Sequence, residues 1–118
     1  MKYLLMIYSD EATDARMSEV DAQAEMAAYG AYAGAMAQAG VLVGGERLRP
    51  TADATAVRIR QGKTELLNGP YADTREQLGG YFMVDVPDLD AALHWAARCP
   101  SASHGTIEVR PIWEMGAA

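Results

Sequence analysis

The segment Asn68-Gly-Pro-Tyr-Ala-Asp-Thr-Arg-Glu-Gln-Leu-Gly-Gly-Tyr81 decides how the rest of the chain is interpreted. It combines a turn dipeptide, several charged or amide side chains and two adjacent glycines, whereas the flanking segments have ordinary strand and helix patterns. The run Asn68-Gly69-Pro70 favours a turn, because asparagine tolerates left-handed backbone, glycine supplies it and proline fixes the exit. We therefore expect any chemistry of this protein to lie near this segment.

Two interpretations of its polar side chains stay open. Asp73 and Glu76 have the spacing of an N-cap residue and its reciprocal acidic partner, so they can begin a short helical turn that ends at Gly79. Alternatively, Asp73 and Glu76 form a cluster with Arg75, beside Tyr71, that binds a polar ligand or moves a proton. In this second interpretation the carboxylates are catalytic, and Tyr71 and Arg75 bind the ligand.

Length and composition indicate one globular domain over residues 1–118. The formal net charge of −6 disfavours direct nucleic-acid binding, because it removes the general attraction to phosphate. The single cysteine, Cys99, cannot form an intramolecular disulfide, and the apolar run at the N-terminus is too short for a signal peptide or a membrane span. We expect a cytoplasmic protein with no membrane association.

The first half of the chain predicts a strand, a helix and a second strand. Residues 2–8 are almost wholly apolar, as in a covered strand, and residues 9–14 form a polar connection. A helix is expected from Glu19 to Gln38, because Ser18 can cap it and Gly40 can stop it. Residues 41–48 form the next strand, in which Gly44-Gly45 predicts a bulge or a close approach by another segment.

The predicted helix has two apolar faces and therefore needs two partners. One face carries small side chains; the other is bulkier and includes Met26, Tyr29 and Met36. One partner is the sheet, and the other is a second subunit or a pocket wall. An alanine-rich helix without a second partner is the alternative.

The second half predicts a hairpin, a strand, a helix and a last strand. Residues 55–60 alternate between apolar and basic side chains and turn into a return strand at 64–67, which predicts a hairpin with one solvent-exposed face. A strand follows at 81–86, then a helix capped by Asp88 up to about Arg98, and a strand at 106–115. Without the inserted hairpin the order is βαββαβ, the ferredoxin-like α+β pattern, whose second sheet face needs a cover.

The last strand supplies further candidates for a site. Glu108 and Arg110 are two residues apart and so share a face of the sheet, where they can line a cleft together with Arg58 or Glu46. Glu108 is a candidate acid or base, and Arg58, Arg110 and the hydroxyl of Tyr29 are candidate ligand contacts. The alternative is a plain surface ion pair worth less than ~1 kcal/mol.

Motifs for the better-known chemistries are missing from the sequence. His94 falls on a polar helix face and His104 in a loop, and neither has a partner at a recognisable spacing. There is no metal-ligand spacing, serine-nucleophile elbow, phosphate loop or dinucleotide fingerprint, so we predict neither a metal nor a cofactor.

Residues 68–76 resemble the Asp-Gly-Pro-Phe-Ala-Glu-Thr-Lys-Glu signature of the DGPF branch of the YCII-related family, with Asn68, Tyr71, Asp73 and Arg75 as departures. Residues 79–81, 88–90, 96–100 and 105–111 also resemble this branch. The resemblance implies a homodimeric α+β barrel. It also implies a possible regulatory link, because members of the branch are similar to proteins encoded beside extracytoplasmic-function sigma factors.

The resemblance does not carry a reaction over to this chain. A proposed His-Asp pair of the smaller YCII-like branch falls on Tyr29 and Gln38 here, so that mechanism is not expected. Two hypotheses follow. The first is a dimeric small-ligand-binding or regulatory module, and the second is an enzyme that acts on a small polar metabolite through carboxylate acid-base chemistry near residues 68–81.

Overall fold

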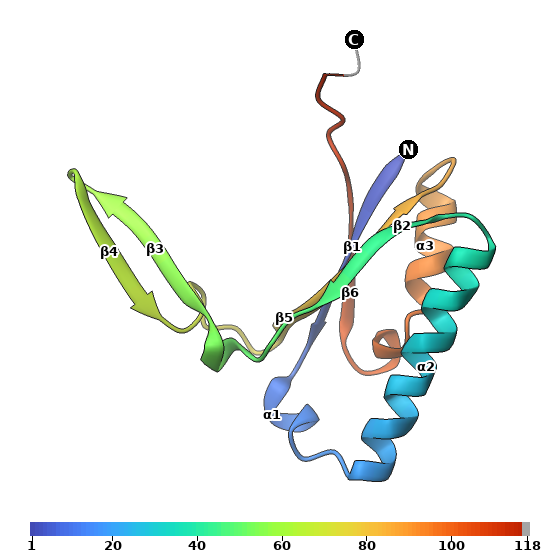
Figure 1. The fold of residues 1–118 in the computed structure, drawn as a ribbon, viewed down its shortest axis with the longest axis horizontal. Helices are drawn as coiled ribbons and strands as arrows, with labels where there is room; N and C mark the ends of the chain where they lie inside the picture. Colours follow the sequence, from blue (N-terminus) through green and yellow to red (C-terminus); the bar gives the residue numbers. More distant parts are fainter. Residues whose placement is uncertain (117–118) are drawn as a thin grey trace.

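A four-stranded antiparallel sheet with helices along one face forms the body of the protein (Figure 1). This is a computed structural model that describes residues 1–116. The strands lie in the order β2 (Leu42–Arg47), β5 (Gln77–Asp85), β1 (Lys2–Ser9) and β6 (Thr106–Pro111). The helices are α1 (Glu11–Asp14), α2 (Glu19–Gln38) and α3 (Leu89–Ala97), with short 3₁₀ turns at Thr51–Asp53 and Pro100–Ser103. This α+β arrangement is consistent with the expected ferredoxin-like pattern.

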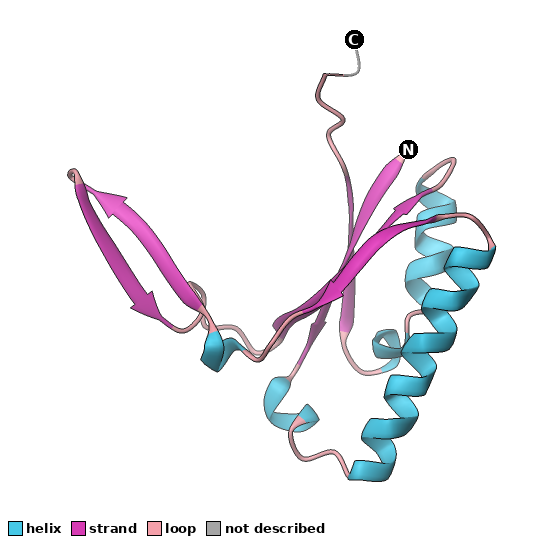
Figure 2. Ribbon diagram, in the orientation of Figure 1, coloured by secondary structure: helices cyan, strands magenta, loops and turns pink. Residues whose placement is uncertain are grey.

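The core lies between the sheet and helices α2 and α3. Alternate residues of β1, namely Tyr3, Leu5 and Ile7, are buried on the helix side. Leu5 is 1% exposed, and Met36 of α2 has no exposed surface. The other residues of β1 therefore point to the opposite face, which no helix covers (Figure 2). We call this second surface the open face.

Helix α2 has the predicted bounds because local signals set both of its ends. The Ser18 side chain accepts a hydrogen bond from the Asp21 N–H at 3.1 Å. Gly40 adopts φ +76°, and the next N–H, of Val41, donates to the Met36 carbonyl at 3.0 Å, which completes a Schellman stop. Of the bulky apolar stripe, Met36 and Tyr29 pack toward the sheet, but Met26 is 63% exposed, and Val20 on the small stripe is 76% exposed.

The glycine pair in β2 marks the expected close approach. The pairing of β2 with β5 shifts register between Leu42 and Gly44. A Cβ atom on Gly45 would lie 2.7 Å from the Tyr81 carbonyl oxygen and 2.7 Å from a ring carbon of Phe82. Only glycine fits at position 45 without displacing β5. The register shift confirms the predicted bulge.

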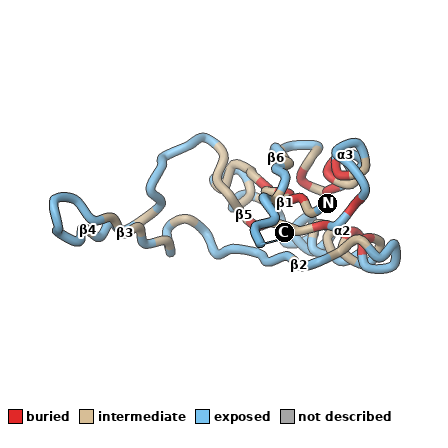
Figure 3. Tube along the Cα trace, turned by 90° about the horizontal axis from the view of Figure 1, so that it is seen from above, coloured by how far each residue is buried: buried red, intermediate tan, exposed pale blue. Residues whose placement is uncertain are grey.

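Strands β3 (Thr55–Arg60) and β4 (Lys63–Asn68) form a separate two-stranded sheet, which we call the arm. The arm extends from the body on the side away from α2 and α3 (Figure 1), and the buried segments lie in the body (Figure 3). Gln61 and Gly62 at its tip both have positive φ, 53° and 74°, as a tight hairpin turn requires. The prediction of a single solvent-exposed face is wrong, because Val57 and Ile59 on the apolar face are each 64% exposed.

The base of the arm is fixed to the body. The Thr51 N–H and hydroxyl donate to the two carboxylate oxygens of Glu11, at 2.9 and 2.6 Å. The Gly69 N–H donates to the Ala54 carbonyl at 2.6 Å and closes the neck of the hairpin. The arm is therefore held at its root while its length stays free of the body.

Three local predictions are wrong. The expected polar connection contains helix α1, because the Asp10 side chain accepts the Ala12 N–H at 3.0 Å and caps it. No helical turn begins at Asp73: residues 71–76 are irregular, β5 begins at Gln77, and both Gly79 and Gly80 lie inside that strand. The last strand ends at Pro111 rather than at residue 115.

Candidate functional site

A broad cleft of about 740 Å³ opens at the end of the sheet where β1 meets α1. Its walls come from β1, α1, the irregular segment before β5, the loop after α3 and the start of β6. The lining residues are Tyr8, Asp10, Thr13, Asp14, Thr74, Arg75, Glu76, His104, Thr106 and Glu108. The volume falls in the range of small-molecule sites.

Strand register places part of this lining on the open face. In the antiparallel pairing of β1 with β6, Tyr8 lies opposite Thr106 and Met6 opposite Glu108. Directly paired residues share a face, so Thr106 and Glu108 stand beside Tyr8, away from the helices. The Thr106 hydroxyl then donates to the Glu76 carboxylate at 2.8 Å, which ties the irregular segment to β6.

The cleft is strongly acidic. Asp10 is the N-cap of α1 and Asp14 its last residue, and the Asp14 carboxylate accepts a hydrogen bond from the Ser9 hydroxyl at 2.6 Å. Together with Glu76 and Glu108 they outnumber Arg75, the one arginine or lysine in the lining. Like charges in a concave surface reinforce each other, so this cleft attracts cations.

The structure brings together part of the predicted site. Arg75, Glu76 and Glu108 all line the cleft. Arg110 lies next to it and donates to Glu108 at 3.1 Å, as the shared face predicts, although both side chains are largely exposed. Asp73 is exposed and lies outside the lining.

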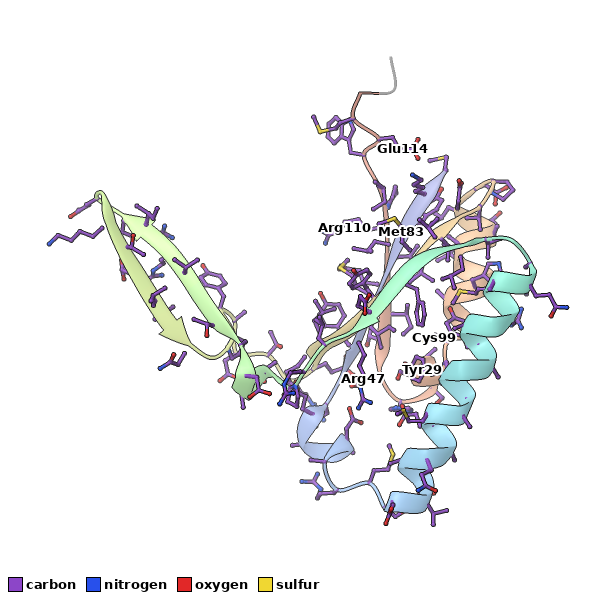
Figure 4. The ribbon with its side chains drawn as sticks, viewed as in Figure 1. Tyr29, Arg47, Met83, Cys99, Arg110 and Glu114 are labelled. Carbon is purple, nitrogen blue, oxygen red and sulfur yellow. The ribbon has the colours of Figure 1, made fainter. Side chains whose placement is uncertain are left out.

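Three predicted ligand contacts lie elsewhere. Tyr71 is 74% exposed and is not part of the lining. Arg58 belongs to the arm, where it donates to Glu65 at 3.4 Å, so it does not join Glu108 in one cleft of the same chain. Tyr29 lies on the other side of the sheet, between α2 and the strands, whereas Met83 and Arg110 point away from that layer (Figure 4).

Tyr29 is the centre of a second polar cluster that the sequence did not reveal. Its phenol hydrogen-bonds with the Ser101 hydroxyl and lies 3.5 Å from the Cys99 sulfur. Ser101 also donates to Glu25 at 3.4 Å, and the same carboxylate oxygen lies 3.7 Å from Nε2 of His104. Since His104 also lines the cleft, the cluster connects the cleft with the interior.

Burial raises the pKa of the Tyr29 phenol well above its ordinary value, and the neighbouring Cys99 adds to the rise. Burial likewise raises the pKa of Tyr32, whose hydroxyl donates to the Trp95 carbonyl at 2.7 Å. Both phenols therefore stay neutral near physiological pH. The Tyr29 hydroxyl can donate or accept a hydrogen bond here, but it cannot act as a phenolate base.

Sequence reasoning missed Asp10, Asp14 and Tyr8 as cleft residues. The available indication was positional: Asp10 and Asp14 follow the first strand directly, and Glu108 lies near the start of the antiparallel strand that pairs with it. Glu25 and Ser101 gave no comparable indication, because only the packing of α2 against the loop after α3 joins them.

Two further observations concern residues 1–116 alone. No group of three or more His, Cys, Asp or Glu side chains in this range is arranged to hold a metal ion. None of the helices in the same range is long and apolar enough to cross a membrane.

The YCII-related domain matches the sequence over residues 1–116. The chain belongs to the YCII-related family. A relative of this YCII-related chain, an uncharacterized protein of Rhizobium meliloti (strain 1021), is 35% identical over 114 residues, which cover 95% of this chain and 92% of the relative.

Proposed function

We propose that this YCII-related protein is a homodimeric module, one domain over residues 1–118, that binds a small cationic ligand in the acidic cleft. The single observation that carries the proposal is that Glu76, Glu108, Asp10 and Asp14 line one cleft with a volume suited to a small molecule. Carboxylates accept hydrogen bonds from amines and guanidinium groups, which favours ligands of that kind.

The homodimer is supported by the open face. Leu4, Met6, Tyr81 and Met83 share this face and are only partly buried, because no helix covers them. Sheets in two-layer folds bury both faces or leave one polar, and this face is largely apolar near its centre. We propose that a second copy covers it, as in a dimeric α+β barrel, and that the arm is an addition to a ferredoxin-like core.

The ligand proposal is tested with thermal-shift and calorimetric measurements on small amines and guanidinium compounds, with carboxylic acids of matched size as the counter-panel. We expect a cationic compound to raise the unfolding temperature, and Glu76→Gln and Glu108→Gln each to weaken its binding about tenfold or more. Glu114→Gln, on an exposed residue outside the cleft, is the matched control.

Other results of that experiment would contradict the proposal. If Asp73→Asn abolishes binding while Glu108→Gln does not, the site lies around Asp73, outside the cleft lining. If no cation binds but a carboxylic acid does, Arg75 and Arg110 define the site and the acidic lining plays no part in it.

An enzyme is the second candidate, and the observation in its favour is that two carboxylates from different elements, Glu76 and Glu108, line one cleft. A pair of carboxylates can divide general acid and general base roles. Asp73, which lies outside the lining, is retained only as a predicted contributor. Turnover of any bound cationic metabolite, lost in Glu76→Gln and Glu108→Gln without loss of binding, would favour this candidate over a binding module.

The finer family placement also stays a proposal. We assign the chain to the DGPF branch on the signature at residues 68–76, and we propose a cytoplasmic regulatory role linked to an extracytoplasmic-function sigma factor on that resemblance alone. Co-purification with such a factor, lost when the cleft or the arm is altered, is the result that this regulatory role predicts.

A further inference from the structure

His104 lies between the acidic cleft and the buried cluster around Tyr29, and the proposed function leaves it without a role. Its ring lines the cleft, and its side chain is 44% exposed, so protons from the solvent reach it. Among the kinds of side chain in this lining, an imidazole is the one that ordinarily changes its charge between about pH 5 and 8. His104 is therefore the group through which a change of pH in that range alters the charge of the cleft.

The loop after α3 holds His104 in this position. A Cβ atom on the next residue, Gly105, would overlap the Tyr8 carbonyl oxygen, so the loop lies directly against the end of β1. The N–H groups of His104 and Gly105 donate to the Ser101 carbonyl at 3.3 and 2.7 Å. Ser101 is 4% exposed, and its hydroxyl donates to Glu25 at 3.4 Å. The backbone below the imidazole is therefore fixed to buried structure.

Both ring nitrogens of His104 have neighbours that suit two protonation states. Nε2 lies 3.7 Å from a carboxylate oxygen of Glu25, within ion-pair range. Nδ1 lies 3.2 Å from the Ser103 hydroxyl oxygen, which lies 3.3 Å from the Pro100 carbonyl. When the neutral ring carries its proton on Nε2, the Ser103 hydroxyl donates to Nδ1. When Nδ1 is also protonated, it donates to the hydroxyl oxygen, and the hydroxyl turns its own proton to the Pro100 carbonyl. Neither state leaves Nδ1 without a hydrogen bond.

The surroundings of His104 are mostly acidic. Glu25 of α2 faces Nε2 of the ring. The titratable and charged groups that other elements place in the lining are Tyr8 on β1, Asp10 and Asp14 at the two ends of α1, Arg75 and Glu76 before β5, and Glu108 on β6. An imidazolium among these carboxylates offsets part of their charge and repels a cation in the cleft. A bound cation in turn disfavours the imidazolium, because the coupling between two binding events is reciprocal.

We propose that His104 is a pH switch for the acidic cleft: when its ring takes up a proton, the added positive charge releases the bound cation. The neutral ring leaves the lining with its full negative charge and permits the cation to bind. No change of fold is needed, because the backbone below the ring is held in place. This inference rests on the proposed cation site and adds to it a regulation by pH.

Calorimetric titration of the full chain with agmatine tests the switch. Agmatine is a small amine that also carries a guanidinium group, and both of its charges persist at about pH 5.5 and about pH 8. We expect the affinity of the wild-type protein to fall about fivefold or more from the higher to the lower pH. His104→Gln, which stays neutral, should bind with nearly the same affinity at both pH values, and His104→Lys, which stays charged, should bind weakly at both.

The second histidine offers a matched control. His94 lies on α3 and outside the cleft lining, so His94→Gln should keep the wild-type ratio of the two affinities. Circular dichroism at both pH values checks that each variant folds.

NMR titration of the two imidazoles gives a second readout, which a purely structural role of His104 would not change. Saturation with agmatine should lower the pH at which His104 is half protonated, because binding disfavours the charged ring. The midpoint of His94 should stay the same. His104→Gln and His94→Gln each remove one of the two sets of signals and so assign them.

The cation site and the switch fail in different ways. A wild-type protein that does not bind agmatine at about pH 8 overturns the cation site and the switch with it. Agmatine binding that weakens equally in the wild-type protein and in His104→Gln overturns only the switch. A His104 midpoint that bound agmatine leaves unchanged also overturns only the switch, because the two charges are then not coupled.

Discussion

Among single residues, Tyr29 shows how surroundings decide chemistry. Its phenol lies against Ser101 and Cys99 on the helix side of the sheet. Burial raises its pKa, so the hydroxyl stays protonated. Tyr29 thus links α2 to the loop after α3 rather than acting as a base.

The raised pKa makes a prediction about alkaline stability. Because the unfolded phenol ionises near pH ~10 and the folded one only above that, the contribution of Tyr29 is full below pH ~10 and is lost as the pH rises through and beyond that value. Urea unfolding between neutral pH and about pH 11 should show a fall in the free energy of unfolding that is shallower in Tyr29→Phe.

Tyr71→Phe removes the hydroxyl of an exposed ring and serves as the control. Equal slopes for the wild-type protein and Tyr29→Phe would contradict the assignment of a buried neutral phenol.

The cleft residues divide according to whether local sequence or strand pairing places them. Arg75, Glu76 and Glu108 were predicted because their charged side chains are concentrated in short segments. Asp10 escaped notice because its first role is local, as the cap of α1, and only the meeting of strand ends brings it beside Glu108. Side chains gathered from distant segments cannot be grouped without the strand order.

At the level of elements, the junction of β2 with β5 limits what the sheet accepts. Gly45 lies against the Tyr81 carbonyl, whereas a Cβ atom on neighbouring Gly44 would meet nothing within 4 Å. The register shift at this point brings one glycine of the pair against β5 and leaves the other open.

These adjacent glycines form a matched test. Gly45→Ala should lower the free energy of unfolding by about 1–3 kcal/mol, because the added methyl group overlaps backbone that cannot move freely. Gly44→Ala should have little effect or a slight stabilising one. Urea denaturation of both variants measures the difference, and equal losses would mean that glycine flexibility rather than the close approach is needed here.

The bounds of a helix could be predicted to the residue where capping residues next to its ends set them. Helix α2 begins and ends as expected because Ser18 and Gly40 act within a few residues. Asp73 and Glu76 offered a similar capping pattern, but Glu76 bonds Thr106 of β6 instead, and the chain enters β5 directly. A capping pattern therefore does not start a helix where the residues that follow it pair in a strand, as Gln77 and its successors do in β5.

For the whole molecule, the uneven distribution of exposed apolar surface matters most. The body buries Leu5 to 1% exposure, while Leu66 on the arm stays 69% exposed. The sequence indicated that the hairpin has an apolar face, but nothing local states what covers it. The alternation of apolar and basic residues predicts that the hairpin has an apolar face. It does not predict how the arm is oriented relative to the body, because contacts between distant segments decide that orientation.

The proposed dimer predicts that stability depends on concentration. The unfolding temperature of the wild-type protein should rise with protein concentration, because association stabilises the folded state by mass action. Leu5→Ala, in the core of one copy, should lower the free energy of unfolding by about 3 kcal/mol at every concentration. Scanning calorimetry over a hundredfold dilution measures both, and a constant unfolding temperature for the wild-type protein would count against association.

The hydrogen bond from the Gly69 N–H to the Ala54 carbonyl has one more consequence. It holds the two ends of the arm next to each other, so a very short turn can bridge them once residues 55–68 are excised. The sheet β2-β5-β1-β6 would keep all its pairings, since β2 and β5 are direct neighbours. The molecule is in this sense modular, because residues 55–68 leave and rejoin the body at one point.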